Sequence, residues 1–143
     1  MITITVSNAA RYALAAILGF APLVCIAQAT QDEQVDLGGY KLFVSESGSG
    51  KPSVVFEAGL GEDVATWRDV QPQISKFALT LAYDRAGLDR SDPSPHPKTV
   101  EEMASELHSL LRASKVPPPY ILVGHSLEPV INFATVAAPD LRA

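Results

Sequence analysis

Three short apolar runs, each about the length of one β-strand, constrain the fold of this chain most. They lie at residues 53–57, 77–83 and 120–123. Apolar runs of this length are typical of strands buried on both faces of a sheet. Between the runs, residues 65–74 and the segment after Thr99 place apolar side chains three and four positions apart, which predicts helices. Strands and helices alternating in this order predict an α/β sheet that is mostly parallel.

The chain before the first of these runs has the pattern of a hairpin. Residues 35–37 and 40–44 read as two short strands around the tight turn Gly38-Gly39. Hairpin strands pair antiparallel, so the sheet is expected to have an antiparallel start. The preceding residues 30–35 are polar, and we expect them to be frayed.

The second helix carries its own start and stop signals. Thr99 is a typical N-cap, and Glu102 stands three residues later, as in a capping box. Pro117 ends the helical pattern, and the proline-rich segment 91–97 before the helix cannot form regular structure. The apolar face of the helix comprises Val100, Met103, Leu107, Leu110 and Leu111.

The first 29 residues have the pattern of a secretory signal peptide. Arg11 is their only charged residue, and an apolar run follows over residues 12–27 before an Ala-Gln-Ala ending at Ala29. A membrane anchor is the alternative, but the run contains Pro22 and is about 16 residues long, short of the roughly 20 that a spanning helix needs. We therefore expect cleavage after Ala29 and a secreted or periplasmic protein. Cleavage would remove Cys25, the only cysteine, and with it any disulfide.

The composition of the whole chain argues against several classes of function; the domain that remains after the expected cleavage is residues 30–143. The chain has 11 Lys and Arg against 16 Asp and Glu, a net charge of -5. This balance argues against nucleic-acid binding, which usually leaves a basic face. Three scattered histidines and one cysteine do not make a metal site, and we expect neither a metal nor a cofactor.

The last apolar run leads into a motif that carries chemistry. Gly-His-Ser-Leu follows it at 124–127, which places Ser126 at the tip of a sharp turn between a strand and an expected helix. The turn resembles the Gly-x-Ser-x-Gly nucleophile elbow, except that Glu128 stands where the second glycine belongs. The competing interpretation of Ser126 is a simple helix N-cap.

Several motifs occur in order over about residues 35–140: Glu-Ala-Gly-Leu-Gly at 57–61, Trp67, Tyr-Asp-Arg-Ala-Gly-Leu-Asp-Arg-Ser at 83–91 and Leu-Val-Gly-His-Ser-Leu at 122–127. The order resembles the N-terminal half of an α/β-hydrolase-fold protein of the serine hydrolase type. The resemblance implies a partial α/β-hydrolase sheet, mostly parallel with an antiparallel start, flanked by helices and lacking the C-terminal strands.

The resemblance also implies a site. Ser126 would be the nucleophile, and the backbone N–H groups of Leu60 and Leu127 would form the oxyanion hole. Gly59 and Gly61 would let the backbone approach the substrate closely, although the same glycines could merely make a turn.

Two neighbouring charged residues invite a catalytic interpretation, but the resemblance favours a structural one. Asp84 and Arg85 match a family pair that ties neighbouring loops together. Asp89 replaces a glycine common in that motif, and Glu57 stands where many relatives have histidine.

No histidine matches the position of the family's general base. His125 adjoins Ser126 but points to the other side of a tight turn, His108 is expected to be solvated on its helix, and His96 lies in the proline-rich loop. In this fold the acid and histidine of the triad follow later strands, which these 143 residues do not reach. We therefore expect a truncated domain whose last strand, 120–123, has an exposed edge open to self-association or a partner.

These observations favour one function over two alternatives. The chain is expected to descend from hydrolases of small-molecule esters, lactones or amides, and to be weakly active or inactive alone because a serine without its base is a poor nucleophile. The alternatives are a non-catalytic binding or interaction module, and one half of a two-chain hydrolase.

Overall fold

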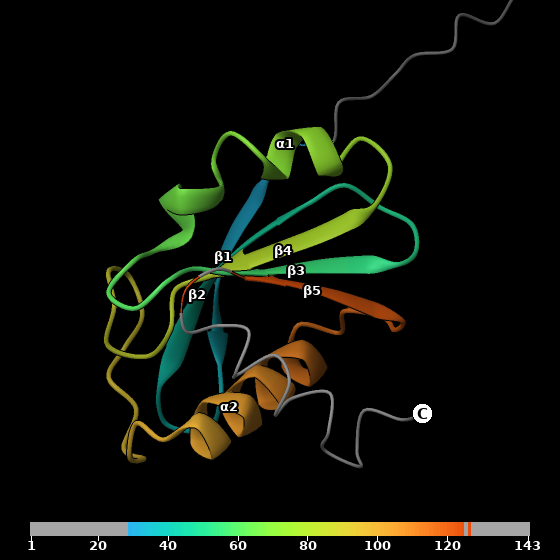
Figure 1. Ribbon diagram of the computed structural model, residues 1–143. Coiled ribbons are helices and arrows are strands. Elements are labelled where there is room, and N and C mark those ends of the chain that lie inside the picture. The colour runs from blue at the N-terminus through green and yellow to red at the C-terminus, as the bar shows by residue number, and fades with distance from the viewer. Residues whose placement is uncertain (1–28, 125, 127–143) are drawn as a thin grey trace, which may run out of the picture.

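One mixed sheet with helices on both of its faces makes up the fold (Figure 1). The computed structural model describes residues 29–124 and 126. The elements in chain order are β1 (Gln31–Asp36), β2 (Lys41–Ser47), β3 (Ser53–Glu57), the 3-10 helix η1 (Val64–Trp67), α1 (Gln71–Ile74), β4 (Leu79–Tyr83), α2 (Val100–Ala113) and β5 (Tyr120–Gly124).

The strand order is β1-β2-β4-β3-β5. β1 and β2 form the expected antiparallel hairpin, in which the Asp36 side chain accepts hydrogen bonds from the N–H groups of Gly38 and Gly39 at 2.7 and 3.3 Å. β2 is also antiparallel to β4, whereas β3 is parallel to both β4 and β5. The sheet predicted from the sequence, parallel after an antiparallel start, is confirmed.

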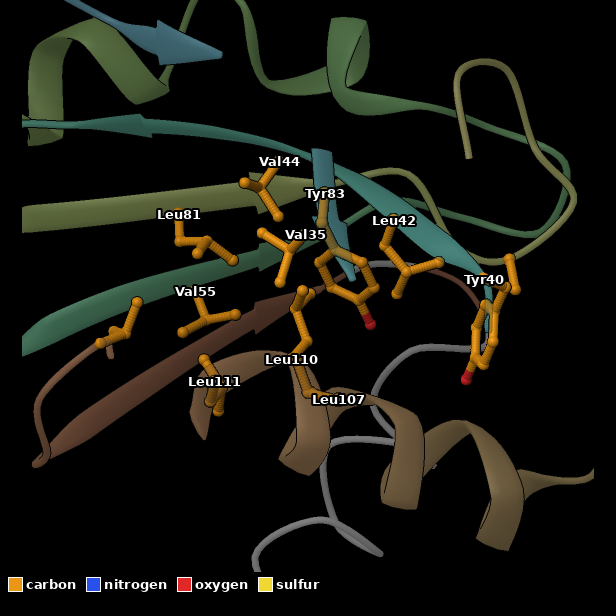
Figure 2. Packing of buried hydrophobic residues seen from close by; sticks show 12 residues of the cluster. Val35, Tyr40, Leu42, Val44, Val55, Leu81, Tyr83, Leu107, Leu110 and Leu111 are labelled. Atoms are coloured by element: carbon orange, nitrogen blue, oxygen red, sulfur yellow. The ribbon is translucent and has the colours of Figure 1, made fainter. Parts of the chain in front are cut away.

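The core has two layers because successive side chains of β3 point to opposite faces. Val55 contributes to the cluster between the sheet and α2, where Leu107, Leu110 and Leu111 are fully buried (Figure 2). Val54 and Phe56 contribute to the opposite cluster, under η1 and α1. All five residues of β3 are buried, as expected for a strand covered on both faces.

The N-cap predicted for α2 is confirmed, whereas the Thr99 N–H, the other donor of a capping box, donates to the Pro97 carbonyl at 3.0 Å. The Thr99 hydroxyl accepts a hydrogen bond from the Glu102 N–H at 3.2 Å, which satisfies a backbone donor that has no partner within the helix. The segment 91–97 before the helix is irregular, as its prolines predict.

Three sequence expectations about local structure were wrong. Residues 30–35 are not frayed, because Gln31–Asp36 pairs along its whole length with β2 while its side chains remain mostly exposed. His108 is not solvated but buried, at 8% exposure, beside Leu107 on the inner face of α2.

The third correction concerns the helix expected at 65–74. It is interrupted: the Asp63 side chain caps the short η1, and α1 begins again at Gln71 with Pro72 in its first turn. Proline has no N–H to donate to the preceding turn, so a helix that ran through this position would lose a hydrogen bond and be kinked or broken.

The expected signal peptide lies almost wholly outside the described residues, which begin at Ala29. Within 29–124 and 126, no helix is long and apolar enough to cross a membrane.

Candidate functional site

The three parallel strands end together at one edge of the sheet. Glu57, the last residue of β3, is in register with Tyr83 on β4 and with Gly124 on β5. The loops that follow the three strands are therefore neighbours, and the carboxyl edge of a parallel sheet is the usual place for a site in such folds.

Ser126 lies in a turn directly after β5, is exposed, and has a φ of 67°. A non-glycine residue in this left-handed region is uncommon and stores backbone strain. An exposed serine in a strained turn at the end of a strand is one feature of a nucleophile elbow. Residues His125, Leu127 and Glu128 lie outside the described part of the chain.

Leu60 is in the loop after β3, and its side chain is 70% exposed. The loop is closed by a hydrogen bond from the Glu62 N–H to the Gly59 carbonyl at 2.9 Å. Gly61 has a φ of 80°, a conformation that favours glycine. Because Gly59 and Ser126 each come two residues after paired positions on β3 and β5, the Leu60 loop and the serine turn share one edge of the sheet.

The buried side chain of Arg85 fixes the position of the loop that contains Leu60. Its Nη1 and Nη2 atoms each donate a 2.6 Å hydrogen bond, to the carbonyl oxygens of Ala58 and Gly59 respectively. The guanidinium is buried, with 8% of its side chain exposed. Two charge-assisted bonds from one rigid group to consecutive carbonyls fix the path of this loop.

Asp84 anchors other segments. Its Oδ1 accepts a 2.8 Å hydrogen bond from the Val64 N–H, and its Oδ2 lies 3.4 Å from Nε of Arg90. Burial raises the pKa of Asp84, although the Val64 N–H and the Arg90 charge oppose that shift. The structural interpretation of Asp84 and Arg85 agrees with these contacts: each residue holds a different segment. Asp89, where a glycine is common, has a φ of 37°.

Glu57 is paired in a way that the sequence interpretation missed. Its Oε1 accepts a 2.8 Å hydrogen bond from the Tyr83 hydroxyl and lies 3.7 Å from Nη1 of Arg85. Burial, followed by the Glu57 charge, raises the pKa of Tyr83 well above its usual value, so the hydroxyl stays protonated and donates. The sequence did contain a signal for this contact, because each of two buried strands ends in a residue with a polar group. Parallel strands that are neighbours bring their ends together, so these two residues can meet.

A hollow that is open to solvent lies beside the Leu60 loop. Its apolar lining includes Leu60, Leu88 and Met103, and its polar lining includes His96 and Glu102. Nδ1 of His96 lies 3.5 Å from Oε1 of Glu102. Within 29–124 and 126, no group of three or more His, Cys, Asp and Glu side chains could hold a metal ion.

Comparison with known proteins agrees with this architecture. No family model matches the chain. The uncharacterized protein YqjL of Bacillus subtilis (strain 168) is 40% identical over 85 residues, which are 59% of this chain and 34% of YqjL. A protein of Gibberella zeae described as an AB hydrolase superfamily protein is 34% identical over 83 residues, which are 57% of this chain and 26% of that protein.

A solved structure extends the comparison to three dimensions. The crystal structure of E-2-(acetamidomethylene)succinate hydrolase matches with a TM-score of 0.69 and 29% identity, over 79% of this chain and 42% of that one. The chain thus spans less than half of the length of each of these proteins. The mixed sheet, the order of its motifs and these likenesses together show that the chain has a partial α/β-hydrolase fold.

Proposed function

We propose that this chain is a serine-hydrolase member of its family, with Ser126 as the nucleophile toward a small-molecule ester, lactone or amide. The observation that carries the proposal is the exposed Ser126 turn, with its φ of 67°, at the end of β5 and beside the Leu60 loop. The likeness to a hydrolase of an acetamido-substituted succinate supports carbonyl chemistry.

The proposed reaction is acyl transfer through the serine. Oγ of Ser126 attacks the substrate carbonyl carbon, and the N–H groups of Leu60 and Leu127 donate to the oxygen that becomes negative. The bond to the alcohol or amine then breaks as this leaving group takes up a proton, and water hydrolyses the acyl-serine to the acid and restores the serine hydroxyl. Each oxyanion donor lowers the barrier by roughly 3 kcal/mol in enzymes of this kind.

The proton of the serine needs a base, and this requirement limits the activity proposed for residues 1–143 alone. His108 is buried on α2 and His96 faces Glu102 in the hollow, so neither has the family's triad position after later strands. We therefore propose weak or absent turnover by these residues alone, and a nucleophile that reacts with activated reagents only slowly.

A fluorophosphonate probe tests this proposal, since it forms a covalent bond with an activated serine. Residues 30–143 are incubated with the probe, and the modified residue is identified by mass spectrometry. We expect slow modification at Ser126, lost in Ser126→Ala and retained in the control Ser49→Ala, an exposed serine. Absence of modification at Ser126, or equal modification of several serines, would contradict the nucleophile assignment.

The edge of β5 favours a second candidate, one half of a two-chain hydrolase. Among the described strands, β5 pairs only with β3, and Ile121 on it is 48% exposed. A strand edge with open N–H and C=O groups can pair with another chain. Modification of Ser126 that becomes fast only when a second polypeptide is added would support this candidate. A binding module would show ligand binding that is unaffected by Ser126→Ala.

We also propose that the protein is exported and cleaved after Ala29. The proposal rests on the sequence pattern of residues 1–29. N-terminal sequencing of the mature protein should begin at Thr30, and an intact Met1 would refute it.

A further inference from the structure

We propose that Glu57 is a positioning residue that, through Arg85, aims the backbone N–H of Leu60 at the substrate oxygen. This inference rests on the proposed function for the role of the Leu60 N–H. Its structural part concerns the orientation of one peptide unit and can be tested separately.

The first step is the link between Arg85 and the Leu60 N–H. The carbonyl of Gly59 and the N–H of Leu60 belong to the same planar peptide unit, and in a trans peptide these two groups point in opposite directions. Nη2 of Arg85 binds that carbonyl at 2.6 Å from the interior. The guanidinium therefore turns the Leu60 N–H away from the core and holds it there.

The second step is the link between Glu57 and Arg85. Glu57 is only 1% exposed, and a buried carboxylate is costly unless charges or hydrogen bonds compensate it. Its Oε1 lies 3.7 Å from Nη1 of Arg85, close enough for strong attraction in a buried environment. The carboxylate thus biases the position of the guanidinium that binds the two loop carbonyls.

The third step is the fixing of Glu57 itself. Tyr83 is its register partner on β4 and donates a 2.8 Å hydrogen bond to Oε1. Its register partner on β5 is Gly124, which adds no side chain to this face of the sheet. Tyr83, Glu57 and Arg85 therefore form a buried series of contacts that ends on the Ala58 and Gly59 carbonyls.

Two variants separate charge from hydrogen bonding within this series. Glu57→Gln keeps the size and an acceptor for Tyr83 but removes the charge facing Arg85. Tyr83→Phe removes the hydroxyl and leaves the charge. Glu33→Gln, on the exposed edge strand β1, is the matched control for loss of a carboxylate.

The first readout is hydrogen exchange at the Glu62 amide, which binds the same Gly59 carbonyl as Arg85, at 2.9 Å. The amide of Val55, in the middle of β3, reports on the stability of the sheet. We expect Glu57→Gln to accelerate exchange at Glu62 about tenfold more than at Val55. Tyr83→Phe should also accelerate exchange at Glu62 more than at Val55, but by a smaller factor. The control Glu33→Gln should leave exchange at both amides unchanged. Equal acceleration at both amides, or none at Glu62, would overturn the inference.

The second readout is the rate of fluorophosphonate modification at Ser126. Loss of one oxyanion donor reduces the rate by about 10²–10³ in a well-studied protease. Glu57→Gln should misorient the Leu60 N–H without removing it, so we expect modification of Ser126 to slow by about tenfold. An unchanged rate together with faster Glu62 exchange would overturn the catalytic part. If the unsubstituted chain is not modified at all, the proposed function fails, while the exchange measurement still decides whether Glu57 positions the loop.

If Glu57→Gln does not fold, Tyr83→Phe decides the question with the same two readouts. Its selective effect at Glu62 would support the inference, and its lack of any effect there would refute it.

Discussion

The hydroxyl of Ser91 donates a 2.6 Å hydrogen bond to the carbonyl oxygen of Asp84, seven residues earlier in the chain. The same hydroxyl accepts a 2.8 Å hydrogen bond from the N–H of Phe43 on β2. One buried side chain therefore joins the turn after β4 to the neighbouring strand, and it holds the segment that carries both Asp84 and Arg85.

Replacement of Ser91 by alanine should loosen this segment. Ser91→Ala leaves a buried N–H and a buried carbonyl without this partner, so we expect the free energy of unfolding to fall by about 1–3 kcal/mol. Urea denaturation followed by the fluorescence of Trp67 measures the change. The exposed Ser49→Ala is the control and should be neutral; an equal loss in both variants would argue against this role of Ser91.

Gly48 is a position where both conformation and space require glycine. Its φ is 83°, and an added Cβ would lie 2.5 Å from the Ser75 carbonyl oxygen and also collide with the carbonyl of Ala78. We expect Gly48→Ala to cost about 3 kcal/mol or more of stability, since both atoms are backbone. Gly38, with a φ of 92° and open space around it, is the matched control, and Gly38→Ala should cost only about 1–2 kcal/mol. Equal losses in chemical denaturation would show that contact at Gly48 is unimportant.

Glu106 should make stability depend on pH. Burial raises its pKa, although hydrogen bonds from the Tyr40 hydroxyl and the Ala86 N–H and the nearby charges of His96 and Lys98 oppose this shift. A raised pKa in the folded state means that this contribution to stability is complete below the ordinary carboxyl pKa and is lost as the pH rises through the raised value.

The glutamine variant isolates this effect because it does not titrate. The free energy of unfolding of Glu106→Gln, relative to that of the unsubstituted chain, should be higher at about pH 7 than at about pH 4. These two pH values lie on either side of the range in which carboxyl groups titrate. Urea denaturation at both pH values gives the difference, with the exposed Glu101→Gln on the same helix as control. A difference that does not change with pH would refute the prediction.

The cap of α2 gives a further test of local stability. Thr99→Ala removes the acceptor of the Glu102 N–H and should lower the free energy of unfolding by about 1 kcal/mol. Thr99→Ser keeps an acceptor and should restore most of the loss. Thermal unfolding followed by circular dichroism measures both variants, and equal stability of all three chains would show that the cap contributes nothing.

Local features of this fold were predictable because neighbouring residues decide them. The Gly38-Gly39 turn, the apolar run of β3 and the Thr99 cap each depend on conformational freedom, burial pattern or hydrogen bonding within a few residues. The local pattern gave a wrong prediction at Gln31–Asp36, a polar segment that was expected to be frayed. Its backbone pairs with β2, and this pairing stabilises a strand whose side chains stay in water.

The sequence by itself indicated the α/β-hydrolase resemblance, the α/β layering and the place of Ser126 after β5, because short motifs and periodicity encode these features locally. Only the tertiary structure decided that Arg85 binds the Ala58 and Gly59 carbonyls, and that Tyr83 fixes Glu57 beneath them. The physical reason is that parallel pairing of β3 with β4 brings together side chains more than 20 residues apart, and no local pattern records which of them will meet.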